Sequence, residues 1–379
     1  MKTNFSQWKT GLVIIAGVFC ACKEENAQPV TAKEASVLKV YAGSTAGHKN
    51  GALLEAQFQY PTLIAIGPDK SLYVVDGGSA VGHQALLTPG TRIRKINPAG
   101  IVSTFFDVTK SNSGIQSING IALNKAGDVY ISEGDQIKMI RPDGRSVALI
   151  AGTGGHEIMK DGEATGATFY EPSALAFDKN DCLYILDTKN NAIRFYSNGK
   201  IKTIAGGDRN FNPEYPGTAP LDGNGREAQF DNPQFLTISP DGSLYVSGGY
   251  FPGIRKVTPA GVVTTFVRGS NEYETEALHT YRGITFEPAG DLFVNLNYGR
   301  PVRNTFSFAV SRVSTQDVKF TELASNSYEI NDQYPYDDAD GFPSFREEGL
   351  NFPTGMVVLE NTLYICNSNS HKILKIDLE

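Results

Sequence analysis

Short apolar stretches alternate with turn sequences along most of the chain, and this pattern predicts β-strands. The clearest stretch is rich in β-branched and aromatic residues, which strands favour. It occurs six times, as "LYVVD", "VYISE", "LYILD", "LYVSG", "LFVNL" and "LYICN". Another apolar stretch precedes each copy, and turn sequences such as "GPDKS" and "SPDGS" separate the two. No helical periodicity of useful length appears after residue 36.

Each copy continues through two more predicted strands, such as "IRKI" and "VSTFF", joined by a short turn such as "NPAG". The unit is therefore four antiparallel strands, A to D, connected as a meander. Six such units predict an all-β fold, a six-bladed β-propeller whose four-stranded antiparallel blades surround a central channel. Because the repeat continues to the last residue, we expect one propeller domain over residues 37–379.

The sixth unit lacks a fourth strand, because the chain ends with "HKILKIDLE", residues 371–379. Proteins usually avoid the open edge that this would leave. Near the other end, "SVLKVYAGS" is similar to the D strands, but no A, B or C strand precedes it. We therefore predict that residues 37–42 form strand D of the last blade and pair with "KILKID", which closes the ring.

The third unit, "DGEATGATFYEPSALAFDKNDCLYILDTKNNAIRFYSNGKIKTIAG", resembles an NHL repeat. It contains DG, A-x-F, Pro, LY-x-x-D-x-x-N, IR and a closing "TIAG" in that order. The fourth unit matches nearly as well but has Gly248 where Asp is usual, whereas units two and five diverge. The resemblance implies a propeller fold that carries binding modules and several unrelated enzymes, so it does not select a function.

The first 21 residues differ from the rest. Lys2 and Lys9 precede the apolar run "GLVIIAGVF", which is too short for a transmembrane helix and is typical of a secretory signal. The sequence "VFCAC" resembles a bacterial lipoprotein signal over residues 1–21, with Cys22 as the lipid-bearing residue and Cys20 as an alternative. Residues 22–36 would then be a flexible tether. The following "KEE" resembles a signal for export to the outer surface, so we expect a surface-exposed outer-membrane lipoprotein, with a periplasm-facing position as the alternative.

Charge narrows the set of partners. The chain has 34 Lys and Arg against 41 Asp and Glu, a net charge of −7, and loss of Lys2 and Lys9 with the signal gives −7 − 2 = −9. This composition has no basic footprint for nucleic acid. We expect membrane contact only through the lipid anchor. Cys182 and Cys366 fall in opposite blades, so they are expected to be buried free thiols.

The meander places connections of different length on opposite faces. A–B and C–D turns lie on one face and are short, whereas B–C and D–A connections lie on the other. The longest of these are residues 77–91, 207–232, 297–308 and 323–352. Because long loops on a rigid scaffold are where binding usually resides, this face is the candidate binding face. The tether enters a D strand from the short-turn face, so the long loops should point away from the membrane.

Two sets of residues on the long-loop face are candidates for ligand binding. The first consists of polar residues at the A-strand entries, expected around the channel mouth: Thr62, Asn119, Ser173, Gln234, Arg282 and Thr354. They either surround a polar ligand or water, with Arg282 as the only cation, or satisfy neighbouring backbone groups. The second set consists of loop aromatics, which suit recognition surfaces but can also fold onto their own rim: Phe211, Tyr215, Tyr250, Phe251, Tyr298, Tyr334 and Tyr336.

The leading hypothesis is a cell-envelope lipoprotein that binds a glycan or an envelope or extracellular protein. The alternative is a metal-assisted lyase or hydrolase of the six-bladed propeller class, with Asp76, Glu133 and Asp187 at the B-strand ends as oxygen ligands. Those carboxylates can equally accept backbone N–H bonds in their own turns. The five histidines do not repeat in register, which favours surface or turn positions. The sequence itself requires no metal and no cofactor.

Overall fold

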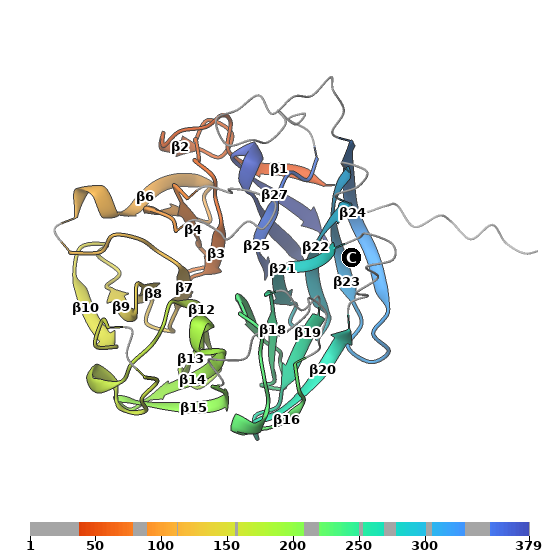
Figure 1. The fold of residues 1–379 in the computed structure, drawn as a ribbon. Helices are drawn as coiled ribbons and strands as arrows, with labels where there is room; N and C mark the ends of the chain where they lie inside the picture. The colour runs from red at the N-terminus through yellow and green to blue at the C-terminus, as the bar shows by residue number, and fades with distance from the viewer. Residues whose placement is uncertain are drawn as a thin grey trace, which may run out of the picture. The chain divides into compact units, whose positions relative to one another are not determined.

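The computed structural model describes residues 38–78, 89–111, 113–155, 158–207, 220–249, 253–268, 278–300, 305–329 and 349–378. Their strands form six antiparallel sheets arranged as a ring (Figure 1). The innermost strand of each sheet contacts the innermost strands of the sheets on both sides, around the whole ring. The predicted six-bladed β-propeller is therefore confirmed. Among the described residues, none of the helices is long and apolar enough to span a bilayer.

The strands of the first three blades follow the predicted A-to-D order from the innermost strand outward. Blade 1 contains β3 (Leu63–Ile66), β4 (Leu72–Asp76), β5 (Arg92–Ile96) and β6 (Ile101–Asp107). Blade 2 contains β7 (Gly120–Leu123), β8 (Val129–Glu133), β9 (Gln136–Ile140) and β10 (Val147–Ala151). Blade 3 contains β12 (Pro172–Phe177), β13 (Leu183–Asp187), β14 (Ala192–Ser197) and β15 (Lys200–Gly206).

The other three blades keep the same order. Blade 4 contains β17 (Phe235–Ile238), β18 (Leu244–Ser247), β19 (Gly253–Val257) and β20 (Val262–Arg268). Blade 5 contains β21 (Leu278–Phe286), β22 (Leu292–Arg300), β23 (Thr305–Val313) and β24 (Phe320–Glu329). Blade 6 contains β25 (Pro353–Leu359), β26 (Thr362–Asn367), β27 (Lys372–Asp377) and β1 (Lys39–Ala42). Short 3-10 helices are η1 (Val108–Lys110), η2 (Ala164–Gly166), η3 (Thr188–Asn190), η4 (Gly225–Glu227) and η6 (Ser368–Ser370).

The ring is closed by the pairing of β1 with β27, as predicted. Lys39 lies opposite Lys375, and Ala42 lies opposite Ile373. The strand begins at Lys39 rather than at residue 37, and Lys39 Nζ lies 3.2 Å from a carboxylate oxygen of Asp377. Strand β27 therefore has neighbours on both sides, and its edge is not open.

Three blades carry a fifth strand that the repeat pattern did not predict. The additional strands are β2 (Gly51–Ala52), β11 (Gly162–Glu163) and β16 (Gly223–Asn224), and they pair with β6, β15 and β20. Each lies in the D–A connection that precedes its blade. The connection thus runs along the outer edge of the next blade and covers it before entering strand A. Two residues are too few to show strand alternation, which is why the pattern missed them.

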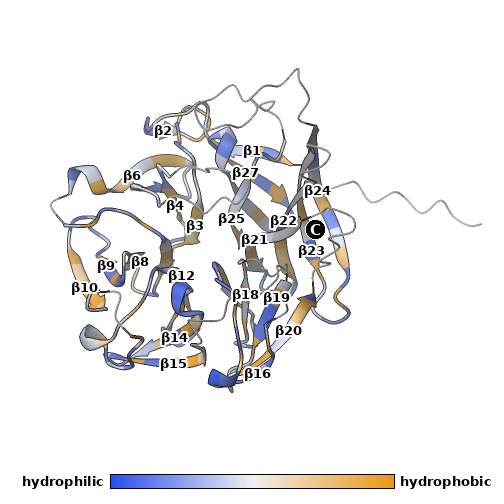
Figure 2. Cartoon of the chain, in the orientation of Figure 1, coloured by the Kyte–Doolittle hydropathy of each residue, from blue (hydrophilic) through white to orange (hydrophobic). Residues whose placement is uncertain are grey.

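The hydrophobic core consists of clusters between neighbouring blades. At the closing seam, Phe58 and Val74 of blade 1 pack with Cys366 and Ile373 of blade 6. Figure 2 shows hydrophobic and hydrophilic residues within single strands, as in β27. Cys182 and Cys366 are free thiols in blades 3 and 6, as expected, although Cys182 is only half-buried.

The two faces differ in loop length as predicted. On the A–B and C–D face, no described connection is longer than residues 141–146 or 314–319, whereas the opposite face carries residues 77–91, 207–234 and 330–352. Two predicted connections were wrong in their bounds. Residues 323–329 belong to strand β24 rather than to a loop. Residues 297–308 are not a long loop, because β22 continues to Arg300 and β23 begins at Thr305. Tyr298 is therefore a strand residue, opposite His279 and Ser307. The Thr, Phe and Tyr residues around this turn suit a sheet better than a loop.

Candidate functional site

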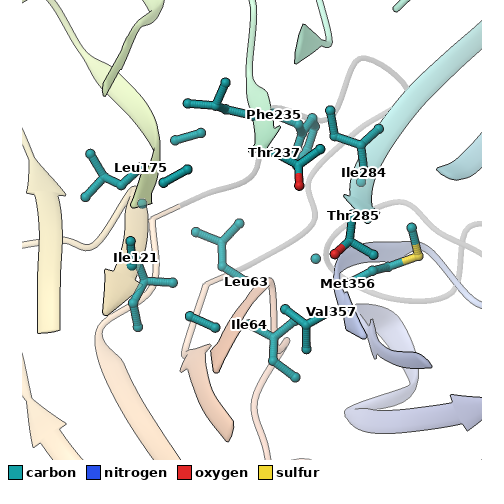
Figure 3. Close-up of a pocket in the computed structure, with 18 of the residues that line it drawn as sticks. Leu63, Ile64, Ile121, Leu175, Phe235, Thr237, Ile284, Thr285, Met356 and Val357 are labelled. Carbon is teal, nitrogen blue, oxygen red and sulfur yellow. The ribbon is translucent and has the colours of Figure 1, made fainter. Parts of the chain in front are cut away.

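A cavity of about 320 Å³ lies at the centre of the ring, lined by the innermost strands of all six blades (Figure 3). Most labelled side chains in Figure 3 are apolar, and Thr237 and Thr285 provide hydroxyl groups. None of the described residues that line it is charged. Of the six residues predicted at the channel mouth, Ser173 and Gln234 line this cavity.

Several of the predicted mouth residues join one blade to the next. The carbonyl oxygen of Thr62 accepts a bond of 2.8 Å from Gly355 N. Ser173 Oγ donates to the Gln234 carbonyl oxygen at 3.2 Å. The carbonyl oxygen of Thr354 accepts from Asn295 Nδ2 at 2.5 Å. In Ser173 a predicted polar side chain satisfies the backbone of the next blade, whereas Thr62 and Thr354 contribute only their backbone carbonyl oxygens to these contacts.

Glycine follows three of these residues because the blades approach closely. A Cβ atom on Gly120 would lie 1.9 Å from the Ser173 carbonyl oxygen, and one on Gly283 would lie 2.0 Å from that of Thr354. A Cβ on Gly355 would lie 2.8 Å from the Thr62 carbonyl oxygen. No side chain fits at such distances, so the glycines allow the strand entries of neighbouring blades to meet.

A buried arginine secures each of blades 1, 3 and 4. We call this arrangement the arginine latch. Its members are Arg94, Arg194 and Arg255, whose Cζ atoms lie 5.2, 5.0 and 5.5 Å from the ring centres of Phe58, Phe169 and Phe230. Each guanidinium also donates hydrogen bonds to carbonyl oxygens of the D–A connection that precedes its own blade.

Arg194 shows the latch in full. Its guanidinium donates to Asp187 at 2.6 Å and to Asp161 at 2.9 Å, as well as to the carbonyl oxygens of Lys160 and Thr168. Burial opposes ionisation of Asp161, but hydrogen bonds from Thr203 and Arg194 hold the pKa of that carboxyl below its usual value. The DG, A-x-F, Asp and IR positions of the repeat therefore form one structural unit.

The carboxylates considered as metal ligands hold their own blades together. Asp76 accepts from Gln59 N at 2.6 Å and from Arg94 Nη1 at 3.3 Å. Glu133 accepts from Lys138 Nζ at 2.8 Å, and Asp187 belongs to the latch of blade 3. In the described parts of the chain, no group of three or more His, Cys, Asp and Glu residues is placed to hold a metal. Their backbone N–H donors are Gln59, Gln116 and Tyr170 in the preceding D–A connections, not residues of their own B–C turns.

A second repeated contact joins neighbouring blades just before strand A. The residue there is left-handed before blades 1, 3, 4 and 6, and before blades 1, 3 and 4 it donates its N–H to a side chain of the preceding blade. The pairs are Tyr60 with His371 Nδ1, Glu171 with Asp135 Oδ1 and Asn232 with Asn191 Oδ1, at 3.2, 2.9 and 2.7 Å. His371 therefore has a structural role that the histidine spacing did not reveal, and burial lowers the pKa of its ring.

Blade 5 lacks the latch. Ser311 stands opposite Val294, as Arg94 stands opposite Val74 in blade 1, and Leu296 follows at the level of Asp76. The buried cation here is Arg282, which does not line the central cavity. It is 9% exposed and its Cζ lies 5.0 Å from the centre of the Phe352 ring in the segment that leads to blade 6. Burial lowers the pKa of Arg282 to about 10, so it is still charged at neutral pH.

Buried polar atoms concentrate near the same seam. Outside the arginines, six buried side-chain atoms of the described residues have no hydrogen-bond partner. They are Asn119 Oδ1, Ser247 Oγ, Asn295 Oδ1, Asn297 Oδ1, Asn297 Nδ2 and Asn351 Oδ1. Four of the six belong to β22 or to the segment before β25. Such an atom costs about 1–3 kcal/mol while it stays without a partner, so this seam has unused capacity for hydrogen bonding.

Most of the predicted loop aromatics lie outside the described residues. This applies to Phe211, Tyr215, Tyr250, Phe251, Tyr334 and Tyr336, and also to the lipidation site Cys22. Tyr298 is the exception, and its backbone lies in strand β22 opposite Ser307.

The sequence matches no protein-family model. It is 30% identical to SUPPRESSOR OF QUENCHING 1, chloroplastic, of Arabidopsis thaliana over 148 residues, which are 36% of this chain and 14% of that protein. It is 23% identical to human NHL repeat-containing protein 2 over 282 residues, which are 67% of this chain and 39% of that protein. The chain therefore spans well under half the length of these relatives.

Solved structures show the same fold. A protein of unknown function from Bacteroides thetaiotaomicron VPI-5482 has a TM-score of 0.55 and 17% identity, covering 90% of this chain and 76% of its own. A gluconolactonase from Xanthomonas campestris has a TM-score of 0.52 and 14% identity, covering 92% of this chain and 99% of its own. At these identities the likeness concerns the fold alone.

Proposed function

Since the chain is a homologue of NHL-repeat proteins and folds as a six-bladed β-propeller, we propose that it is a binding module of the cell envelope. Its long-loop face binds a glycan or an envelope or extracellular protein. The observation that carries this proposal is the difference between the faces. One face has only short turns, whereas the other has the connections 77–91, 207–234 and 330–352. Long connections on a rigid scaffold commonly provide recognition.

The position of β1 supports an orientation for this module. Its first residue, Lys39, pairs with Lys375 near the end of β27, on the short-turn face. The chain before Lys39 therefore enters the propeller on that face. If Cys22 carries the lipid and residues 22–36 form the tether, the tether joins the propeller at its short-turn face. The long loops then point outward from an outer membrane, or into the periplasm if the protein faces inward.

The alternative of a metal-assisted lyase or hydrolase has less support. Asp76 and Asp187 each bind a buried arginine, and Glu133 binds Lys138. None of them lines the central cavity, among the residues described there. No observation in the described parts of the chain brings these carboxylates together at one reacting centre.

The test is a binding screen of the mature, unlipidated chain against glycan arrays and outer-membrane protein fractions. We expect a specific ligand whose binding falls at least about tenfold when Tyr215, Tyr250 and Phe251 are all replaced by Ala, because aromatic anchors dominate such surfaces. The control is Val318→Ala, an exposed apolar residue in the C–D turn of the short-turn face, which should leave binding unchanged. Equal binding by the triple variant and the wild type would contradict the choice of face.

A further inference from the structure

Two asparagines of blade 5 face blade 6. Asn295 and Asn297 are two residues apart in β22, so their side chains lie on the same side of the sheet. Asn295 Nδ2 donates to the Thr354 carbonyl oxygen at the entry to β25, which identifies that side as the one towards blade 6. Consistently, Phe308 stands opposite Asn297 in β23, and its ring centre lies 5.9 Å from that of Phe352.

The amides at this seam have hydrogen-bonding capacity that the described protein groups do not use. Asn295 is 0% exposed and Asn351 is 4% exposed, and in each of them Oδ1 has no partner among the described residues. Both amide atoms of Asn297 are buried and lack a partner in the same sense. The seam therefore offers three acceptors and one donor. Because buried polar groups in native proteins are almost always paired, a species that mainly donates hydrogen bonds is expected here.

Among the described residues, blade 5 contributes three of the six atoms without a partner, whereas blades 2 and 4 contribute one each, Asn119 Oδ1 and Ser247 Oγ. In blade 2, Ser132 stands opposite Gly120 just as Asn295 stands opposite Gly283. Ser132 Oγ makes the same contact to the next blade, a bond of 3.2 Å to the Ser173 carbonyl oxygen. Two residues further on, blade 2 has Gly134 where blade 5 has Asn297. A serine is thus sufficient for the hydrogen bond to the next blade. Blade 5 makes this bond with Asn295 Nδ2 and has additional amide atoms in Asn295 and Asn297.

Charge limits what could fill the seam. Arg282 is buried against Phe352 in the segment before β25, so a positive charge already lies beside the amides. A second cation would be repelled at this place. A neutral species with several hydroxyl groups satisfies both conditions, because each hydroxyl donates one bond and also accepts.

We propose that the seam between blades 5 and 6 is a binding site for a neutral, hydroxyl-rich ligand such as a sugar unit, held by the amides of Asn295, Asn297 and Asn351. This inference rests on the proposed binding function and deepens it. Of the two partner classes considered there, it selects the glycan. Asn297 is the specificity-determining residue, since both of its amide atoms are buried without a protein partner and its side chain therefore makes no hydrogen bond that supports the fold.

The test compares the wild type with Asn297→Leu by calorimetric titration with glucose, galactose, N-acetylglucosamine and maltose. We expect at least one sugar to bind the wild type and Asn297→Leu to bind it at least about tenfold more weakly, since two hydrogen bonds are lost. The melting temperature of the variant should be equal or higher, because an amide without a protein partner is replaced by an apolar group. The matched control is Asn361→Leu in the A–B turn of blade 6, on the opposite face, which should bind as the wild type does.

Four results would overturn the proposal. Binding of none of these sugars would do so, and so would equal sugar binding by Asn297→Leu and the wild type, since the seam would then hold water only. If the variant with Tyr215, Tyr250 and Phe251 replaced loses a ligand that Asn297→Leu retains, the seam proposal fails and the long-loop face remains the binding surface. If no glycan or envelope protein binds the wild type at all, both proposals fail together.

Discussion

Blades 3 and 5 have the same four-stranded plan but are held together in different ways. Blade 3 contains the complete repeat motif, and the buried Arg194 joins strand β14 to Asp187, Asp161 and the preceding connection. Blade 5 has Ser311 at the position of that arginine and carries its buried cation, Arg282, on the innermost strand instead. Its strands are also longer, at 9, 9, 9 and 10 residues against 6, 5, 6 and 7 in blade 3.

The repeat motif therefore stabilises the blade that contains it, and a blade without the motif can be stabilised by longer strands instead. Blade 5 gains additional backbone pairing from its longer strands, residue by residue from Leu292 to Arg300 against β23. Polar side chains at the seam between blades 5 and 6 are then not needed to bind the D–A connection that precedes blade 5. This difference explains how Asn295 and Asn297 can be buried with atoms left over, whereas the polar groups around Arg194 are engaged with one another.

The largest expected effect comes from breaking the latch of blade 3. Arg194→Leu should lower the free energy of unfolding by about 3–5 kcal/mol, because Asp187 would be left buried without its charged partner. Urea or guanidinium denaturation measures this difference. The matched control is Arg141→Leu, since Arg141 pairs with Asp128 but its side chain is 57% exposed, and it should cost at most about 1 kcal/mol. Equal losses for the two variants would show that the latch is not what secures blade 3.

A smaller effect is expected from the close contacts between strand entries. Gly120→Ala and Gly283→Ala should each cost about 1–3 kcal/mol, because the added Cβ would overlap a carbonyl oxygen of the next blade. Similar losses at the two sites would show that the seams after blades 2 and 5 are equally tight in their backbone and differ only in side chains. Gly166→Ala is the control, since nothing lies within 4 Å of its Cβ. A loss at Gly166 as large as at Gly120 would contradict the steric explanation, and thermal melting of the three variants decides the question.

The smallest effect is expected in the pH dependence of the free energy of unfolding, through His371 at the seam between blades 6 and 1. His371 Nδ1 accepts from Tyr60 N, and burial lowers the pKa of its ring, while Asp76 opposes and Lys372 reinforces that shift. The unfolded state therefore binds a proton more readily than the folded state, and stability should fall as the pH drops below about 6.5. His371→Asn, which copies Asn191 of blade 3, should remove this part of the acid sensitivity. Because the ring is only partly buried, we expect a difference below about 1 kcal/mol between pH 7 and pH 5. An unchanged pH dependence of unfolding in the variant would exclude His371 as its source.

The sequence predicted features that arise from local alternation and repetition. The six units, the strand order and the pairing of residues 39–42 with 372–377 follow from stretches such as "LYVVD" and "KILKID", which look alike in every copy. It did not reveal features that depend on contacts between distant segments. Examples are the two-residue strand β11 on the edge of β15 and the acceptor role of His371, 311 residues from Tyr60.

In the candidate site, too, the local features were predicted and the contacts between distant segments were not. The polar residues at the strand entries were recognised from the sequence, but their direction was not. Arg282 lies against Phe352 rather than along the central cavity. Asn295 and Asn297 looked like ordinary members of a divergent strand. Only the position of blade 6 shows that Asn295 Oδ1 and both amide atoms of Asn297 are buried without protein partners.

The most direct test of the sugar site between blades 5 and 6 is a crystal structure of the protein soaked with the sugar that binds best in the titrations. The claim predicts a sugar between blades 5 and 6 on the long-loop face, with hydroxyl groups bonded to both amide atoms of Asn297 and to Asn295 Oδ1. A sugar bound elsewhere, with only water at these amides, would contradict it.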